Sequence, residues 1–91
     1  MRAVKSNALK INPEDNVAIA IRDIRKGEPV VVDGAEICLA TEDIPASHKI
    51  AIVPISKGAP VIRYGEPIVV ATTDIALGQW VHVHNTMPIE R

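Results

Sequence analysis

The sequence predicts one small, mainly β domain built from short strands around an internal duplication. The chain has 91 residues, of which 47% are apolar, and a chain of this size buries one hydrophobic core rather than two. Aromatic residues are scarce, so Val, Ile, Ala and Leu must fill that core, and the β-branched members of this set fit pleated strands. In addition, shifting the sequence by 31 residues aligns it with itself without a gap.

The self-alignment indicates a duplication, because fourteen of twenty-six aligned positions are identical and include glycines and prolines at fixed offsets. The identical pairs are Ile19/Ile50, Ala20/Ala51, Ile21/Ile52, Ile24/Ile55, Lys26/Lys57, Gly27/Gly58, Pro29/Pro60, Val30/Val61, Gly34/Gly65, Ile37/Ile68, Ala40/Ala71, Thr41/Thr72, Asp43/Asp74 and Ile44/Ile75. We expect a pseudo-twofold arrangement in which each copy completes the core of the other, so that neither half folds alone.

Each copy contains two turns of the pattern Ile-x-x-Gly/Ser-x-x-Val/Ile, which begin at residues 24, 44, 55 and 75. The pattern predicts an apolar anchor, a turn whose small residue takes a positive φ, and entry into the next strand. Ser47 replaces glycine in the second turn. Pro29 and Pro60 follow a turn glycine, which predicts entry into edge strands, where a missing N–H is tolerated.

Short apolar runs between the turns predict the strands. They span residues 17–21, 30–32, 37–40, 50–53, 61–63, 68–71 and 80–84, and a further terminal strand is expected at 4–8. Residues 10–16 read as a polar turn, and no window has the spacing of a long amphipathic helix. We therefore expect a single domain over 1–91, with a core of about 16–85 and a frayed tail or linker start at 86–91.

Charge and cysteine content exclude several classes of partner. Ten basic and eleven acidic residues are scattered without blocks, which argues against nucleic acid or an anionic membrane surface as a partner. No apolar run approaches the roughly 20 residues that span a bilayer. The single Cys38 cannot form an intrachain disulfide, and Met1 is not followed by a charged-then-apolar leader, so we expect a cytoplasmic protein.

The His-x-His-Asn motif near the C-terminus is the strongest candidate for chemistry. In an extended strand, His82 and His84 emerge on one face, with Val81 and Val83 on the other. Two imidazoles can supply part of a site for iron, manganese or zinc, and Asn85 adds an amide that can orient a ligand. A pair is too few for a closed site, and the alternative is a solvent-facing sheet surface without a specific role.

Two other positions are weaker candidates. His48, followed by Lys49, lies after the Ser47 turn, where it can contact an anion or carboxylate, or can be an ordinary exposed loop residue. Tyr64 and Gly65 fill the hairpin position that Asp33 and Gly34 occupy in the first copy; Gly65 is expected there for its backbone, and Tyr64 for either packing or function. The chain lacks a nucleophile turn, a phosphate loop and a Cys-x-x-Cys motif, so an autonomous enzyme is not expected.

Taken in order, His48-Lys49-Ile50-Ala51, Ile55-Ser56-Lys57-Gly58, Ile62-Arg63-Tyr64-Gly65-Glu66-Pro67-Ile68 and His82-Val83-His84-Asn85-Thr86 resemble a known family. That family comprises the N-terminal domain or small subunit of the altronate and galactarate dehydratases. It is a SAF domain with a β-clip fold and is related to the small subunit of sulfolactate sulfo-lyase. The resemblance covers about residues 16–85. Ser47 and Arg63 depart from the family pattern, which usually has glycine and lysine there.

The resemblance implies a carbon–oxygen lyase that removes water from a sugar acid to give a 2-keto-3-deoxy acid. It also implies a large catalytic subunit or domain as partner and a divalent metal in the complete enzyme, iron or manganese, with no activity of this chain alone. The site residues it carries over are His48, Lys49, Tyr64, Gly65, His82, His84 and Asn85, with His82 and His84 as the metal candidates. Three alternatives stay open: a sulfolactate sulfo-lyase subunit, a free-standing module that binds a metal or small anion, and a homo-oligomerisation unit.

Overall fold

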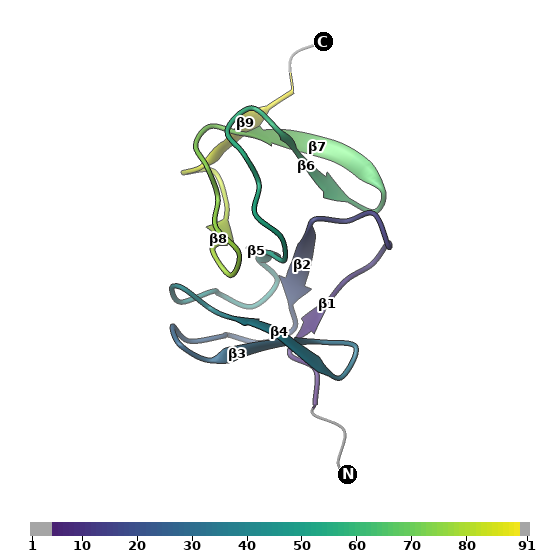
Figure 1. Cartoon of the computed structure of the whole chain (residues 1–91), viewed down its shortest axis with the longest axis vertical. Coiled ribbons are helices and arrows are strands. Elements are labelled where there is room, and N and C mark those ends of the chain that lie inside the picture. Colours follow the sequence, from purple (N-terminus) through teal and green to yellow (C-terminus); the bar gives the residue numbers. More distant parts are fainter. Residues whose placement is uncertain (1–4, 90–91) are drawn as a thin grey trace.

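The computed structural model describes residues 5–89 and is all-β over that range, as the composition predicts (Figure 1). Its strands are β1 (Ala8–Leu9), β2 (Val17–Ala20), β3 (Pro29–Val32), β4 (Ala35–Leu39), β5 (Lys49–Ala51), β6 (Pro60–Arg63), β7 (Glu66–Ala71), β8 (Trp80–Val81) and β9 (Thr86–Pro88). The described residues include no helix of the length and apolarity needed to traverse a bilayer. Of the terminal strand expected at 4–8, Ala8 lies in β1, and Val4 lies outside the described residues.

Strands β1, β2, β5 and β8 form a central antiparallel sheet, in the order β1-β2-β5-β8. The β3–β4 hairpin lies at one end of this sheet, and β6, β7 and β9 lie at the other (Figure 1). Pro29 and Pro60 each begin an edge strand, as predicted. Residues 86–88, expected in a frayed tail, instead form β9, because Thr86, Met87 and Pro88 pair with Ala71, Val70 and Val69 of β7.

The duplication seen in the sequence recurs in the hydrogen bonds. Isolated bridges join Ile24 to Ile44 and, 31 residues later, Ile55 to Ile75. The N–H of Gly27 donates to the Ala40 carbonyl at 2.8 Å, and that of Gly58 to the Ala71 carbonyl at 2.8 Å. All four predicted turn residues take a positive φ: +86° at Gly27, +71° at Ser47, +85° at Gly58 and +86° at Gly78. The serine therefore keeps the turn conformation of its glycine counterparts.

The expectation of one core is wrong, because the buried apolar side chains form two clusters. One contains Ile24, Val30, Ile44 and Ile50, with Ala8, Ala18, Ala20, Val32 and Ala40; the other contains Val17, Ala51, Ile55, Val61, Ala71, Ile75 and Val81. Strands β2 and β5 serve both clusters, since successive side chains of a strand point to opposite faces: Ala18 and Ile50 face the first, and Val17 and Ala51 the second. Each half thus contributes to the core of the other, as the duplication predicts.

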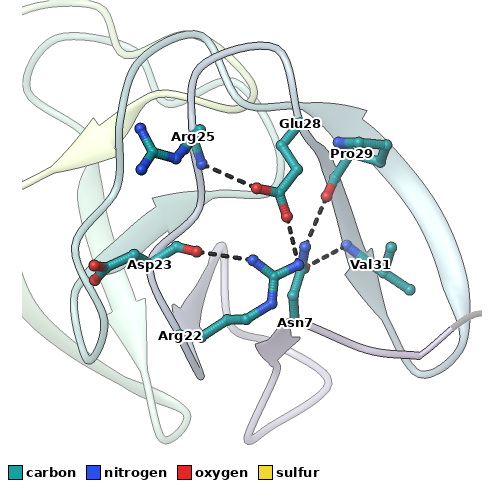
Figure 2. A network of polar contacts seen from close by, with 7 residues as sticks. All are labelled: Asn7, Arg22, Asp23, Arg25, Glu28, Pro29 and Val31. Atoms are coloured by element: carbon teal, nitrogen blue, oxygen red, sulfur yellow. Dashed lines mark hydrogen bonds and ion pairs between the residues drawn. The ribbon is translucent and has the colours of Figure 1, made fainter.

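Two asparagines fasten the hairpins to the N-terminal segment. The Asn7 amide accepts from the Val31 N–H at 2.8 Å and donates to the Pro29 carbonyl at 2.8 Å (Figure 2). Asn16 makes the same pair of bonds with the N–H of Ile62, at 2.7 Å, and the carbonyl of Pro60, at 2.9 Å. We call Asn7 and Asn16 the asparagine staples. Beside the first staple, Arg22 pairs with Glu28, which also accepts from the Arg25 N–H (Figure 2).

Candidate functional site

The histidine motif lies on a turn and not on a strand, so the predicted strand at 80–84 is wrong beyond Val81. Strand β8 ends there, and residues 82–85 turn back into β9. The His82 N–H donates to the Asn85 side-chain oxygen at 2.9 Å, and the Asn85 N–H donates to the His82 carbonyl at 3.1 Å. Val83 is 78% exposed, at the tip of this turn, instead of lying on the strand face opposite the histidines.

Asn85 has a structural role in this turn. Its side chain is buried, and its amide nitrogen donates to the Trp80 carbonyl at 2.8 Å while its oxygen accepts from His82. Both of its polar atoms hold backbone groups of the turn, and a role for this amide in orienting a ligand stays a prediction. What Asn85 does is fix where the two histidines project.

Four rings, from the residue before β5, from β8 and from the turn, gather at one place, and we call His48, Trp80, His82 and His84 the ring cluster. The rings of Trp80 and His82 are stacked, with centroids 5.1 Å apart and planes 11° apart. The His48 ring lies 4.8 Å from that of His82, and the His84 ring lies 5.3 Å from that of Trp80. These separations are those of packed aromatic rings.

His48 is fixed in the cluster by a hydrogen bond. The Trp80 Nε1–H donates to His48 Nδ1 at 3.1 Å. Because Nδ1 accepts, the proton of the neutral imidazole must lie on Nε2, which leaves Nε2–H as the free donor. His48 is thus a positioned donor next to His82, not a free loop residue.

Lys49 lies beside the ring cluster and alters its electrostatics. It pairs with Val81, the residue before His82, in the β5–β8 ladder. Burial and the charge of Arg63 lower the pKa of the half-buried Lys49 ammonium. Partial desolvation, followed by the charges of His48, Lys49 and His84, lowers the pKa of His82 and so favours its neutral form.

Tyr64 and Gly65 form the tip of the β6–β7 hairpin. Their φ values of +56° and +74° match those of Asp33 and Gly34, +51° and +77°, as a two-residue turn with positive φ at both positions requires. Tyr64 is 56% exposed and thus packs into neither core; its ring lies 4.8 Å from the Arg63 guanidinium carbon.

Gly65 is needed for its backbone, as predicted. Its N–H donates to the Asp15 carboxylate at 2.8 Å, and a Cβ there would come within 2.9 Å of the Asn12 amide. Burial opposes ionisation of Asp15, but the N–H groups of Gly65, Asn12 and Tyr64, with the charge of Lys10, lower the pKa of this carboxyl below its ordinary value. Asp15 is therefore a buried carboxylate that holds the hairpin tip.

His82 and His84 do not make a metal site by themselves. Within residues 5–89, no group of three or more His, Cys, Asp or Glu side chains is arranged to hold an ion, whereas zinc sites use at least three protein ligands. The ring centroids of His82 and His84 are 6.5 Å apart, and His48 Nδ1 is already occupied by Trp80. This chain can thus supply two imidazoles at most, and the other ligands would have to come from elsewhere.

The structure brings together the rings of three predicted residues, His48, His82 and His84, with Lys49 next to them in the β5–β8 ladder. It adds two residues that sequence reasoning missed as site residues. Trp80 is the only tryptophan, and at the equivalent position of the other copy the sequence has Lys49. This difference between the two copies is the signal that could have marked Trp80 as a site residue. Arg63 connects the Tyr64 tip to Lys49 through its ring contact and its charge.

Comparison with known proteins identifies a matching family model and a similar protein. The family model described as "Altronate/galactarate dehydratase SAF domain" matches residues 6–88. The chain is 44% identical over 78 residues to a protein of Bacillus subtilis (strain 168) named altronate dehydratase. That alignment covers 86% of this chain and 16% of the relative, so the chain spans about a sixth of the relative's length.

Proposed function

The chain belongs to the altronate/galactarate dehydratase SAF domains, and from that membership we propose that it works as the accessory domain of a sugar-acid dehydratase. In this proposal a large catalytic chain or domain removes water from the sugar acid, giving a 2-keto-3-deoxy acid. The ring cluster forms the face that this domain turns toward the catalytic site. The observation that carries the proposal is the gathering of basic groups from separate segments without a complete catalytic set.

The chemistry of dehydration explains what such a face can contribute. Loss of water requires removal of the proton next to the carboxylate and departure of the neighbouring hydroxyl, and negative charge builds on the carboxylate side as the proton leaves. Neutral His82 and the Nε2–H of His48 lie side by side, so one can accept a hydrogen bond and the other can donate one. They can therefore orient a polyhydroxy acid at its entrance to the catalytic site.

A divalent metal, iron or manganese, remains part of the proposal for the complete enzyme. Such an ion would polarise the carboxylate and the leaving hydroxyl. Because this chain offers two imidazoles at most, we assign most of the ligands to the catalytic chain.

Reconstitution with the catalytic chain of an altronate dehydratase, expressed without its own SAF domain, tests the proposal. We expect this chain to raise the rate of 2-keto-3-deoxy acid formation from altronate or galactarate, and His82→Ala to reduce that gain. Val53→Ala, the same kind of truncation at the exposed repeat counterpart of His84, is the matched control and should keep the gain. Full activity of the catalytic chain without this one would overturn the proposal, and turnover of sulfolactate alone would assign the domain to a sulfo-lyase.

A further inference from the structure

Trp80 lies between two histidines on one face of the central sheet. Ile50 pairs with Trp80 in the β5–β8 ladder, and side chains two residues apart along a strand point to the same face. His48, two residues before Ile50, therefore shares a face with Trp80. His82 follows Trp80 by two residues, and its ring stacks on the indole. The indole is thus the side chain that both histidines contact.

The position of the indole is set by groups other than these histidines. The Trp80 N–H donates to the Glu42 carboxylate at 3.2 Å, and the Trp80 carbonyl accepts from the Asn85 amide at 2.8 Å. The half-buried side chain packs against the core cluster that contains Ile24 and Ile50. A side chain held in this way can orient its neighbours.

The indole contacts the two histidines in different ways. Its face stacks on His82, with ring centroids 5.1 Å apart and planes 11° apart. Its edge meets His48 at an interplanar angle of 61°, and the Nε1–H donates to His48 Nδ1 at 3.1 Å. The stack restricts the plane of the His82 ring, whereas the hydrogen bond determines which nitrogen of His48 carries the proton.

A neutral imidazole has two ways to change its hydrogen-bonding role. Its proton can move from one nitrogen to the other, and rotation of the ring about the Cβ–Cγ bond exchanges the places of nitrogen and carbon atoms. The His48 backbone is already anchored, since its N–H donates to the Pro45 carbonyl at 3.1 Å and its carbonyl accepts from the Ala20 N–H at 2.9 Å. An indole can only donate, so Nδ1 must face it and must carry no proton.

We propose that Trp80 is a positioning residue that commits His48 to donating, through its Nε2–H, to an oxygen of the bound sugar acid. This role rests on the proposed function, which supplies the acid. Without the indole N–H both histidines remain, but His48 can then present either a donor or an acceptor to the ligand. Trp80 acts through His48 and does not itself need to touch the substrate.

Nitrogen-15 nuclear magnetic resonance of the 91-residue chain tests the tautomer directly, at about pH 8, where ordinary imidazoles are neutral. We expect a coupling across the hydrogen bond from Trp80 Nε1 to His48 Nδ1, and His48 nitrogen shifts typical of one tautomer. In Trp80→Phe, which keeps a flat ring but has no N–H, these two shifts should move toward each other as the second tautomer becomes populated. Averaged shifts in the wild-type chain, or unchanged shifts in Trp80→Phe, would overturn the proposal.

Trp80→His is the matched variant, because it restores the donor. When the five-membered rings of histidine and indole are superposed, the histidine Nε2 takes the place of the indole Nε1 and can carry a proton there. Both variants shorten the side chain, so a difference between them reports the N–H and not the lost volume. We expect Trp80→His to return the His48 shifts toward their wild-type values, and shifts equal to those of Trp80→Phe would contradict the proposal.

The reconstituted dehydratase tests whether the bond matters for the reaction. Trp80→Phe should reduce the gain in rate roughly tenfold, and Trp80→His should stay within about threefold of wild type. In a His48→Ala background, Trp80→Phe should cause no further loss, because a positioning residue acts through its partner. A full gain in Trp80→Phe, or additive losses in the double variant, would refute the positioning role.

The positioning role and the proposed function fail separately. Averaged His48 nitrogens in the wild-type chain overturn the positioning role even if the chain stimulates the dehydratase. If the nitrogens behave as expected but the catalytic chain is indifferent to this domain, the dehydratase role is wrong, and Trp80 still sets the tautomer of His48.

Discussion

Replacing Gly78 with alanine should destabilise the domain far more than the same change at the other two turn glycines, Gly27 and Gly58. The three glycines occupy equivalent turns, with φ values of +86°, +86° and +85°. A Cβ built at Gly27 or Gly58 meets nothing within 4 Å, whereas at Gly78 it would lie 2.3 Å from the Leu39 carbonyl oxygen. The obstacle is backbone, which cannot swing aside as a flexible side chain would.

The magnitude follows from two separate costs. Alanine in a left-handed conformation costs about 1 kcal/mol, and this is the whole cost expected at Gly27 and Gly58. At Gly78, displacement of β4 adds about 2 kcal/mol, for a total of about 3 kcal/mol. In a domain whose total stability is on the order of 5–15 kcal/mol, this loss corresponds to a melting temperature lower by roughly 15 °C.

Urea unfolding followed by far-ultraviolet circular dichroism measures all three variants on one scale. Circular dichroism is preferable to fluorescence because Trp80 lies two residues from Gly78 and would respond to local displacement. A free energy of unfolding for Gly78→Ala within about 0.5 kcal/mol of that for Gly58→Ala would refute the clash. Such a result would mean that β4 yields to the added methyl group.

Three further predictions concern polar groups. His48→Ala should lower the free energy of unfolding by about 1 kcal/mol and shift the Trp80 emission, because the indole N–H loses its acceptor. His48→Asn, which can offer an acceptor, should restore part of the stability and part of the emission. Identical spectra for all three proteins would contradict the Trp80–His48 hydrogen bond. The lowered pKa of Asp15 means that its contribution to stability is present above its ordinary value of 3.8 and is lost as the pH falls through the lowered pKa. Asp15→Asn should therefore be less stable than wild type at pH 6, the difference should shrink as the pH falls below 3.8, and parallel pH profiles would contradict this. The lowered pKa of His82 means that unfolding takes up protons just below pH 6.5, so stability should decrease there as the pH is lowered. Nuclear magnetic resonance should give a His82 pKa that rises in Lys49→Met, and an unchanged value would contradict the assigned repulsion.

The turns were predictable because their signal is local. A glycine at Gly27 or Gly58, flanked at fixed offsets by an isoleucine and a proline, specifies positive φ and strand entry without reference to the rest of the chain. Even Ser47 follows the rule, since its place in the repeat indicates the conformation that its residue type does not. Family membership was predictable for the same reason, from short motifs in a fixed order.

The asparagine staples and the ring cluster depend on distant partners, so the sequence alone did not indicate them. Asn7 and Asn16 lie nine residues apart, although the hairpins that they hold are related by the 31-residue shift, so self-alignment does not match one with the other. The Trp80–His48 bond joins residues 32 positions apart. The turn at 82–85 was missed because alternating residues predict a strand, whereas the Asn85 side chain stabilises a competing turn.

The unequal reach of the two staples has a consequence for the order of assembly. Asn7 binds Val31 across a separation of 24 residues, and Asn16 binds Ile62 across 46. Closing the longer loop costs about 0.6 kcal/mol more chain entropy, because its length is nearly doubled. The longer loop also encloses the β3–β4 hairpin, which can form beforehand and shorten it. We therefore expect the N-terminal hairpin to dock first and its C-terminal counterpart to form on that template, so that pulse-labelled hydrogen exchange should protect Val31 before Ile62.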